Sequence, residues 1–401
     1  MASDATIFIP GIKGTKLTET NRPTWDVIWS GIQHNFETIE DLELTAAYRG
    51  EHFEENPHSI IRPSEIESLA YDEFLRDLAT EAPVYIFNYD WRLSASNNGE
   101  RLKRFMDYLV DKSRARSDPA NDRRASIRSP IERFDFISHS LGNFILRNYI
   151  ARYGFRRINK IVFAVPPFEG SIDVVAGALI GEGFFPNVKA KIRKYIRTWP
   201  GALELLPSYD GASRFVPGNR VHSFFNFNHW QDNVVNAEGP IPEKMKKALR
   251  LARSVVNGHL CDLRALPPDQ RKRILIIVRD GFETWQSVRV QKEEPGKPRN
   301  FVDFDYGLRT SDGDGRVPHV SSCCYCDAVK TLILKNDFWH REYNHGFFLK
   351  DERAQTLVNR FLYKGGRFKS TIPGDSIKRV AGLERKEDSS TGMPFWRARV
   401  R

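Results

Sequence analysis

The stretch FDFISHSLGN, residues 134–143, joins a short apolar run to a serine flanked by small residues. Its first four residues are typical of a buried strand, and apolar residues recur at four-residue spacing from position 141 onward, which indicates a helix. The segment between them, Ser138-His139-Ser140-Leu141-Gly142, is therefore predicted to be a sharp strand-to-helix turn, where small residues avoid collisions with the neighbouring backbone. Such a turn holds the hydroxyl of Ser140 at a helix N-terminus, where the N–H of Leu141 stabilises negative charge. We interpret Ser140 as a nucleophile.

Similar apolar runs recur along the chain, rich in Ile, Val or Phe and apolar on both faces. They cover residues 6–9, 84–87, 134–137, 160–165, 273–278 and 329–334. Runs of this kind are typical of central strands in a parallel sheet. Helical patterns lie between them, and the last one, at 354–362, follows the i, i+3, i+4, i+7 spacing. We expect an α/β fold, with a mostly parallel central sheet covered by helices on both faces.

The interval between the fourth and fifth runs is too long for a single crossover connection. It carries two helical stripes of its own, at 188–199 and 245–256, so we expect an inserted helical cap or lid. The expected organisation is a core over 1–169 with a small excursion at about 30–80, a cap over 170–270, a second part of the core over 271–363, and a basic tail over 364–401. Residues 113–129 are expected to form a surface loop.

Composition indicates a soluble globular protein with a net charge of +10, of which +6 lies beyond residue 363 (ten Lys and Arg against four Asp and Glu). We interpret this last segment as a solvated, partly disordered tail, with attraction to an anionic membrane surface as the alternative. No zinc-finger spacing or basic platform with interleaved aromatic residues predicts a nucleic-acid partner. The oligomeric state is not predicted.

The four cysteines, Cys261, Cys323, Cys324 and Cys326, do not form a disulfide framework. Cys323 and Cys326 have zinc-knuckle spacing, but no second pair of ligands follows, so free thiols are expected and no metal. The N-terminal sequence lacks the pattern of a secretory signal, and no apolar run is long enough to span a bilayer. These features predict a cytoplasmic protein, with peripheral membrane contact left open.

A serine nucleophile needs a base that is oriented by an acid. The turn at 311–318 (SDGDGRVP) offers Asp314, with Asp312 as the alternative and Asp280 as a remote third choice. Two histidines follow the last predicted strand, and His345 is preferred to His340 as the base. Two further histidines are given other positions. His319 is expected at the surface, and His139 is expected to line the turn beside Ser140.

The oxyanion formed in acyl transfer needs at least two hydrogen-bond donors. One is the N–H of Leu141. The other is expected in the loop after the first strand, residues 10–15 (PGIKGT), whose glycines let backbone amides turn inward. Ile12 is the preferred donor there, with Lys13 next.

Six motifs occur in one order along the chain: PGIKGTKL (10–17), YDWR (89–92), SHSLG (138–142), PPFEGS (166–171), GDGRVP (313–318) and NHG (344–346). Together they resemble the lecithin:cholesterol acyltransferase family of α/β hydrolases, which includes lysosomal phospholipase A2 and the phospholipid:diacylglycerol acyltransferases. The resemblance implies an α/β-hydrolase fold, a triad of Ser140, Asp314 and His345, and oxyanion donors at Ile12 and Leu141. It implies no cofactor and treats YDWR as architectural.

The chain departs from the family pattern at two motif positions. Ser138 stands where many members have Gly, and Arg316 stands where Thr is usual. The secretory signal or membrane anchor and the disulfides of the animal enzymes are also missing from the sequence, which argues against plasma-type substrates.

The resemblance implies a serine acyl hydrolase or O-acyltransferase acting on lipid or other acyl esters. The alternatives are an esterase for small soluble esters and a non-catalytic binding protein of the same fold. Residues 174–185 are apolar and contain glycine, like a mobile lid. The basic amphipathic stretch at 188–199 is interpreted as a cap helix with its charges in water, and a helix lying at a lipid interface is the alternative.

Overall fold

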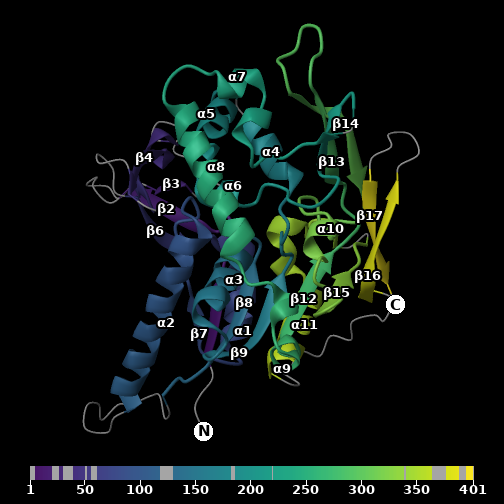
Figure 1. Cartoon of the computed structure of the whole chain (residues 1–401). Helices are drawn as coiled ribbons and strands as arrows, with labels where there is room; N and C mark the ends of the chain where they lie inside the picture. Colours follow the sequence, from purple (N-terminus) through teal and green to yellow (C-terminus); the bar gives the residue numbers. More distant parts are fainter. Residues whose placement is uncertain are drawn as a thin grey trace.

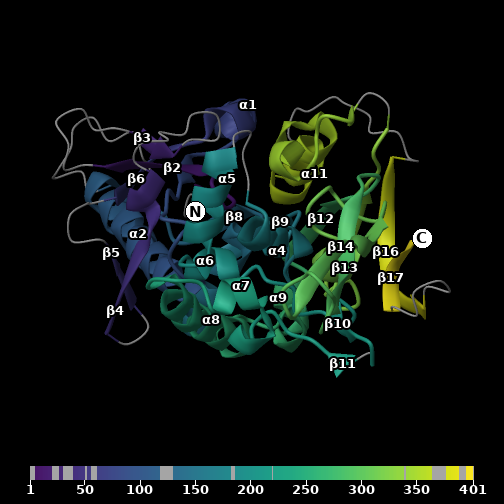
Figure 2. The ribbon, with the colours of Figure 1, turned by 90° about the horizontal axis from the view of Figure 1, so that it is seen from above.

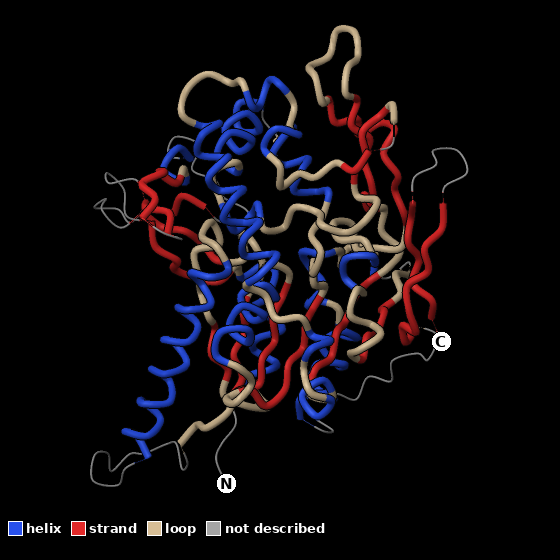
Figure 3. The backbone as a smooth tube through the Cα atoms, in the orientation of Figure 1, coloured by secondary structure: helices blue, strands red, loops and turns tan. Residues whose placement is uncertain are grey.

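The computed structural model describes residues 5–19, 27–29, 39–49, 52–55, 61–117, 130–181, 186–218, 220–337, 340–363, 376–387 and 394–400. Its centre is an eight-stranded sheet with the order β17-β16-β15-β12-β9-β8-β1-β7. Figure 1 shows this sheet in the lower half of the molecule, and Figure 3 shows helices packed against it. Across the described residues, no helix is both long and apolar enough to cross a bilayer.

Six neighbouring strands of this sheet are parallel, and they correspond to the six apolar runs in the sequence. They are β7 (Val84–Ile86), β1 (Ala5–Ile9), β8 (Phe134–His139), β9 (Ile158–Ala164), β12 (Ile274–Arg279) and β15 (Lys330–Leu334). The strands β1, β8 and β12 are buried along their whole length, because helices cover both faces. The predicted α/β class is confirmed.

Alternate residues of each strand enter two separate cores. Phe8 and Ile137 belong to the core beneath α1 (Ser68–Ala79) and α11 (Glu352–Tyr363). Ile7 and Phe136 belong to the larger core beneath α2 (Ala95–Ser117) and α3 (Gly142–Tyr153). In the view from above, α1 and α11 lie along one side of the sheet and α8 (Ile241–Gly258) lies on the other (Figure 2).

The C-terminal segment differs from the predicted solvated tail. Its described parts form β16 (Ile377–Glu387) and β17 (Pro394–Val400), an antiparallel pair that extends the sheet beyond β15. Only one face of these edge strands needs to be apolar, as the burial of Val380 and the exposure of Arg379 illustrate. Charged residues on the other face gave the segment the composition of a tail.

Segments near the N-terminus form small sheets beside the core. Residues 118–129, most of the predicted surface loop, lie outside the described part of the chain. One sheet contains β2 (Thr15–Glu19), β3 (Val27–Trp29) and β6 (Ile61–Ile66); another contains β4 (Leu44–Arg49) and β5 (His52–Glu55), and η1 (Ile39–Leu42) precedes β4. The first residues of the predicted loop, 113–117, instead complete α2.

The region expected as a cap contains six α-helices among its described residues. They are α4 (Ile172–Leu179), α5 (Pro186–Ile196), α6 (Pro200–Leu203), α7 (Asp232–Val235), α8 and α9 (Pro268–Arg271), with η2 (Phe227–His229) and η3 (Leu263–Ala265) between them. On α5 the apolar stripe is buried, whereas Lys189, Arg193 and Lys194 are exposed, as the cap-helix interpretation expects. Part of the proposed lid, residues 182–185, lies outside the described residues.

A second sheet crosses the expected boundary at residue 270. It has the order β11-β10-β13-β14, joining β10 (Ser213–Val216) and β11 (Arg220–Val221) to the hairpin of β13 (Thr284–Gln291) and β14 (Phe301–Thr310). The short α10 (His319–Ser322) follows the turn that carries the candidate acid, and η5 (His345–Lys350) begins with the candidate base.

Candidate active site

Ser140 stands on a strained turn between β8 and α3. Its φ is 51°, in the left-handed region that non-glycine residues seldom adopt. Gly142 makes the turn sterically feasible, because a Cβ there would lie 2.7 Å from the carbonyl oxygen of Ile9 and 2.8 Å from that of Pro10. The turn therefore presses the start of α3 against the end of β1.

The residue that replaces the usual glycine braces this turn. Ser138 is fully buried, and its Oγ donates to Oδ1 of Asn143 at 2.7 Å. The Nδ2 of Asn143 in turn donates to the carbonyl oxygen of Ser140 at 2.6 Å. A serine at position 138 thus fits the turn and adds a hydrogen bond to it.

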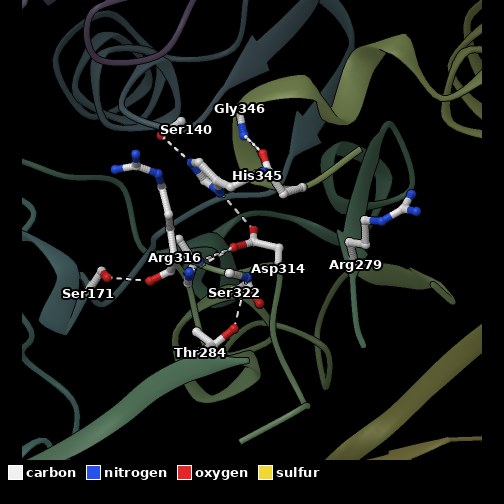
Figure 4. A network of polar contacts seen from close by, with 12 residues as sticks. Ser140, Ser171, Arg279, Thr284, Asp314, Arg316, Ser322, His345 and Gly346 are labelled. Carbon is white, nitrogen blue, oxygen red and sulfur yellow. Dashed lines mark hydrogen bonds and ion pairs between the residues drawn. The ribbon is translucent and has the colours of Figure 1, made fainter. Parts of the chain in front are cut away.

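His345 connects the serine to the acid. Its Nε2 lies 2.8 Å from Ser140 Oγ and its Nδ1 lies 2.7 Å from Asp314 Oδ2 (Figure 4). Because a carboxylate only accepts, Nδ1 carries the proton donated to Asp314, which leaves Nε2 free to accept from the serine hydroxyl. Asn344 caps η5 by accepting from the N–H of Gly346 at 3.1 Å, which fixes the start of the segment that carries His345.

The carboxylate of Asp314 is buried and held by its own turn. Its Oδ1 accepts from the backbone N–H groups of Arg316 and Val317 at 3.0 and 2.8 Å. Burial alone would raise the pKa of Asp314, but the charge of His345 and the hydrogen bonds from His345, Val317 and Arg316 outweigh it and lower the pKa. The group therefore stays ionised and able to stabilise a protonated His345.

The structure leaves the alternative acids and base away from Ser140. The carbonyl of Asp312 accepts from the N–H of His319, and its carboxylate lies 3.7 Å from Nε of Arg397. Asp280 Oδ1 accepts from a backbone N–H, that of Asn336, at 3.2 Å. The other candidate base, His340, bonds through Nδ1 to Asp337.

His319 corrects the sequence analysis, because it is buried and not at the surface. Its Nε2 donates to the carbonyl oxygen of Arg279 at 3.0 Å. The residue opens α10, which follows the acid turn, and this hydrogen bond connects it to the last residue of β12. The histidine thereby helps to tie the acid turn to the sheet.

The two proposed oxyanion donors flank the serine. In the described part of the chain, the backbone N–H groups of Ile12 and Leu141 donate to no protein acceptor. Ile12 lies in the loop between β1 and β2, where the neighbouring Lys13 has a φ of 62° and Gly14 N–H closes a turn by donating to Gly11 O at 3.0 Å. The geometry therefore leaves both amides available to a ligand.

The YDWR segment fixes this oxyanion loop (residues 10–15) from behind. Tyr89 Oη donates to the carbonyl oxygen of Pro10 at 2.8 Å, and Trp91 Nε1 donates to that of Thr15 at 3.0 Å. Asp90 and Arg92 form a buried ion pair of 2.7 Å next to these residues. Both ends of the loop are thus held by side chains of one motif, as the architectural interpretation expects.

A cavity of about 270 Å³ lies beside Ser140 and His345. Its apolar lining includes Leu69, Val174, Ile196, Ala202, Leu205 and Phe347, and its charged lining consists of Lys13, Glu67, Asp173 and Arg316. Arg316 pairs with Asp173 at 2.7 Å, which ties α4 to the acid turn (Figure 4 shows Arg316 and Ser171 on this side). The apolar wall suits an acyl chain, since small-molecule sites are mostly apolar with few polar groups.

Sequence reasoning missed the residues that α1 contributes to this cavity. The most informative is Tyr71, a buried residue of α1 whose Oη lies 2.8 Å from His139 Nδ1. His139 lines the turn as expected, and burial together with the nearby His345 lowers its pKa to about 3. Nothing local in the α1 sequence separates such a tyrosine from an ordinary core residue.

The described residues hold no disulfide. All four cysteines are unpaired, and Cys323 and Cys324 are buried. Within the described ranges, no group of three or more His, Cys, Asp or Glu side chains is arranged to hold a metal ion.

These features together define one architecture. The serine turn follows the third parallel strand along the chain, and the segments with the acid and the base follow the fifth and the sixth. The chain has the α/β-hydrolase fold. A chain in the crystal structure of the Tle4–Tli4 complex shares the fold, with a TM-score of 0.56 and 13% identity over 90% of this chain and 98% of that one.

Other solved structures overlap less closely. A gene product of Listeria innocua has a TM-score of 0.34 and 12% identity over 90% of this chain and 94% of that one. A structure from a study of carboxylesterases of Nitrososphaera gargenis has a TM-score of 0.27 and 10% identity over 70% and 73%. No protein-family model and no curated protein matches the chain.

Proposed function

We propose that the chain is a serine-dependent acyl hydrolase or O-acyltransferase that acts on lipid or other acyl esters, of the lecithin:cholesterol acyltransferase type. The observation that carries the proposal is the hydrogen-bonded series Ser140–His345–Asp314 beside an apolar cavity. A nucleophile, a base and an orienting acid at these distances are the parts that serine acyl transfer requires.

Acylation begins when His345 Nε2 takes the proton of Ser140 and Oγ forms a bond to the ester carbonyl carbon. The carbonyl oxygen becomes an oxyanion and accepts hydrogen bonds from the N–H groups of Ile12 and Leu141. The bond to the leaving alcohol then breaks, and His345 returns the proton to that alcohol. Asp314 remains ionised throughout and stabilises the charged His345.

Deacylation repeats these steps with water or a second alcohol as the attacking group. The acceptor loses its proton to His345, its oxygen bonds to the acyl carbon, and Ser140 leaves with the proton. Water yields a carboxylic acid and an alcohol yields a new ester. Residues 170–270 are the proposed cap over the site. The degree to which this cap excludes water decides whether the acyl group goes to water or to a second alcohol.

The direct test incubates a mixed lipid extract with the wild type and with Ser140→Ala, followed by mass spectrometry of the lipids. We expect the wild type to consume an acyl ester and Ser140→Ala to lose at least about 10⁴-fold in rate. The donor that disappears and the product that forms identify both substrates. Equal labelling of the two proteins by a fluorophosphonate probe would contradict the proposal and favour a non-catalytic binding protein.

A small soluble ester is the second candidate substrate, and the modest volume of the cavity favours it. Activity is measured against acyl chains of increasing length, with and without vesicles. A rise in rate when the substrate exceeds its monomer solubility supports a lipid substrate. Rates that stop rising at that limit support the soluble ester.

A further inference from the structure

Three hydrogen bonds connect the oxyanion loop to the segment that carries His345, through two side chains next to the serine. The N–H of Gly11 lies 3.3 Å from Tyr71 Oη, and Tyr71 Oη lies 2.8 Å from His139 Nδ1. The third bond joins His139 Nε2 to the carbonyl oxygen of His345 at 2.9 Å. The three bonds link positions that lie far apart in the sequence.

The direction of each bond follows from chemistry. A backbone carbonyl only accepts, so His139 Nε2 carries a proton and donates it to His345. The neutral imidazole then has a lone pair on Nδ1, to which the hydroxyl of Tyr71 donates. The oxygen of Tyr71 accepts from Gly11 N–H, so every polar atom along the series has a partner.

Close packing leaves this series little freedom. A Cβ on Gly11 would lie 2.8 Å from His139 Nδ1 and 2.9 Å from Ser140 Cβ, so the loop rests directly on the histidine and the serine. The rings of Tyr71 and His139 meet edge to face with centroids 5.6 Å apart. The rings of His139 and His345 have centroids 5.3 Å apart.

We propose that Tyr71 and His139 are positioning residues that set the distance between the oxyanion loop and His345. Gly11 immediately precedes Ile12, one of the two proposed donors, and the carbonyl that receives the last bond belongs to the proposed base itself. A shift of the loop therefore changes the site at two points at once. This inference rests on the proposed function and deepens it. Neither residue transfers a proton in the reaction, so both act by holding other groups in place.

Burial supports this role by keeping the histidine neutral. Both side chains are buried, and desolvation, with the charge of His345 as a further contribution, lowers the pKa of His139 to about 3. A protonated His139 would lose the lone pair that accepts from Tyr71. The series thus keeps one arrangement across the pH range in which His345 acts as a base.

The test compares Tyr71→Phe, His139→Gln, His139→Leu and the Tyr71→Phe/His139→Leu double variant in the full chain. The substrate is a p-nitrophenyl ester, and active sites are counted by the endpoint of fluorophosphonate labelling. We expect Tyr71→Phe to lower kcat per active site about 10- to 100-fold with KM within twofold, less than the loss of a whole oxyanion donor. The affinity for a trifluoromethyl ketone, which forms an oxyanion with the serine, should fall by a similar factor.

Two comparisons separate positioning from general stability. His139→Gln keeps an amide donor and acceptor and should retain more activity than His139→Leu. The double variant should be little worse than the more damaged single variant, because both changes interrupt one series. Tyr209→Phe is the matched control, since its buried Oη donates to the carbonyl of Gln286 at 2.9 Å away from this site, and its kcat should match the wild type.

Two results would overturn the inference while the proposed function stands. One is a wild-type kcat per active site for Tyr71→Phe, with only the melting temperature lowered. The other is strictly additive losses in the double variant. If the wild type neither hydrolyses the ester nor reacts with the fluorophosphonate, the proposed function fails and this inference fails with it.

Discussion

Asp314 and His345 are joined twice, by side chains and by backbone. The carboxylate lies 2.7 Å from Nδ1 of the ring, and the backbone N–H of His345 donates to the carbonyl oxygen of Asp314 at 2.9 Å. The second bond ties together the two turns that follow different strands of the sheet. The orientation of the ring thus depends on the turn at residues 311–318 as well as on the carboxylate.

The carboxylate of Asp314 can be tested without disturbing the backbone bond. Asp314→Asn keeps the shape but can present an amide donor to Nδ1, which favours the wrong tautomer of His345. We expect kcat for ester hydrolysis to fall on the order of 10³- to 10⁴-fold. Asp312→Asn, in the same turn, is the matched control and should stay within about threefold of the wild type. A loss of kcat for Asp312→Asn that exceeds the loss for Asp314→Asn would show that Asp312 is the acid instead.

A buried charge network near η5 should be important for stability. The carboxylate of Asp351 is fully buried between the guanidinium groups of Arg279 and Arg353, and it lies 2.7 Å from the latter. Asp351→Asn leaves the buried Arg279 without the carboxylate it pairs with, whereas Arg353 keeps its ion pair with Asp337. We therefore expect the free energy of unfolding in urea to fall by about 3–5 kcal/mol.

The matched control for this network is Glu283→Gln, which removes an exposed ion pair with Arg309. It should cost less than about 1 kcal/mol. Equal costs for the two variants would mean that the buried network contributes no more than a surface pair.

Two buried histidines predict how stability varies with pH. Burial lowers the pKa of His139 and of His222 to about 3, whereas an unfolded histidine titrates near 6.5. Between these values the unfolded chain binds more protons, so the free energy of unfolding falls as the pH drops below about 6.5. Each histidine contributes roughly 1 kcal/mol per pH unit. Urea titrations from pH 5 to 8 measure how steeply the free energy of unfolding depends on pH, and His222→Gln should make this dependence weaker. An unchanged dependence would show that His222 is not one of the groups responsible.

Gly142 should tolerate no side chain. A Cβ there would meet two backbone carbonyl oxygens of the first strand and loop at less than 3 Å. We expect Gly142→Ala to cost about 1–3 kcal/mol of stability, by analogy with overpacked cores, and to lower kcat more than tenfold by displacing Ser140. Gly258→Ala is the control, because an added Cβ there meets no atom within 4 Å apart from its chain neighbours and its own helix backbone. Its melting temperature should equal or exceed that of the wild type.

The central sheet could be predicted because its strands are buried on both faces. Continuous apolar runs mark such strands locally, so the six parallel strands were visible in the sequence. The order of serine, acid and base along the chain then pointed to Ser140, Asp314 and His345, which the structure brings within hydrogen-bonding distance. Local sequence sufficed for Ser140 because it directly follows β8, whereas Asp314 and His345 were found as an acid and a base in the segments that follow β14 and β15.

The other features depend on contacts that leave little local signal. Tyr71 reaches His139 from α1, and a tyrosine in an amphipathic helix looks the same whether its hydroxyl meets water or a histidine. The second sheet was missed because polar residues separate the apolar ones in β13 (TWQSVRVQ), which therefore lacks a continuous apolar run although it is mostly buried. His319 was placed at the surface because a Gly-rich turn precedes it, although the turn directs it inward.

The C-terminal strands have a practical consequence for anyone preparing this protein. Trp396 Nε1 donates to the carbonyl oxygen of Asp210 at 3.2 Å, and the carbonyl oxygen of Trp396 accepts from Gln286 Nε2 at 3.0 Å. The hairpin of β16 and β17 is therefore hydrogen-bonded to two segments that are distant in the sequence. The basic composition of the last segment could suggest ending an expressed chain at residue 363. Such a chain lacks β16, so β15 becomes an edge strand whose backbone from Leu332 to Leu334 has no pairing partner. Unprotected edges of this kind recruit further chains, so the shortened protein should accumulate in inclusion bodies.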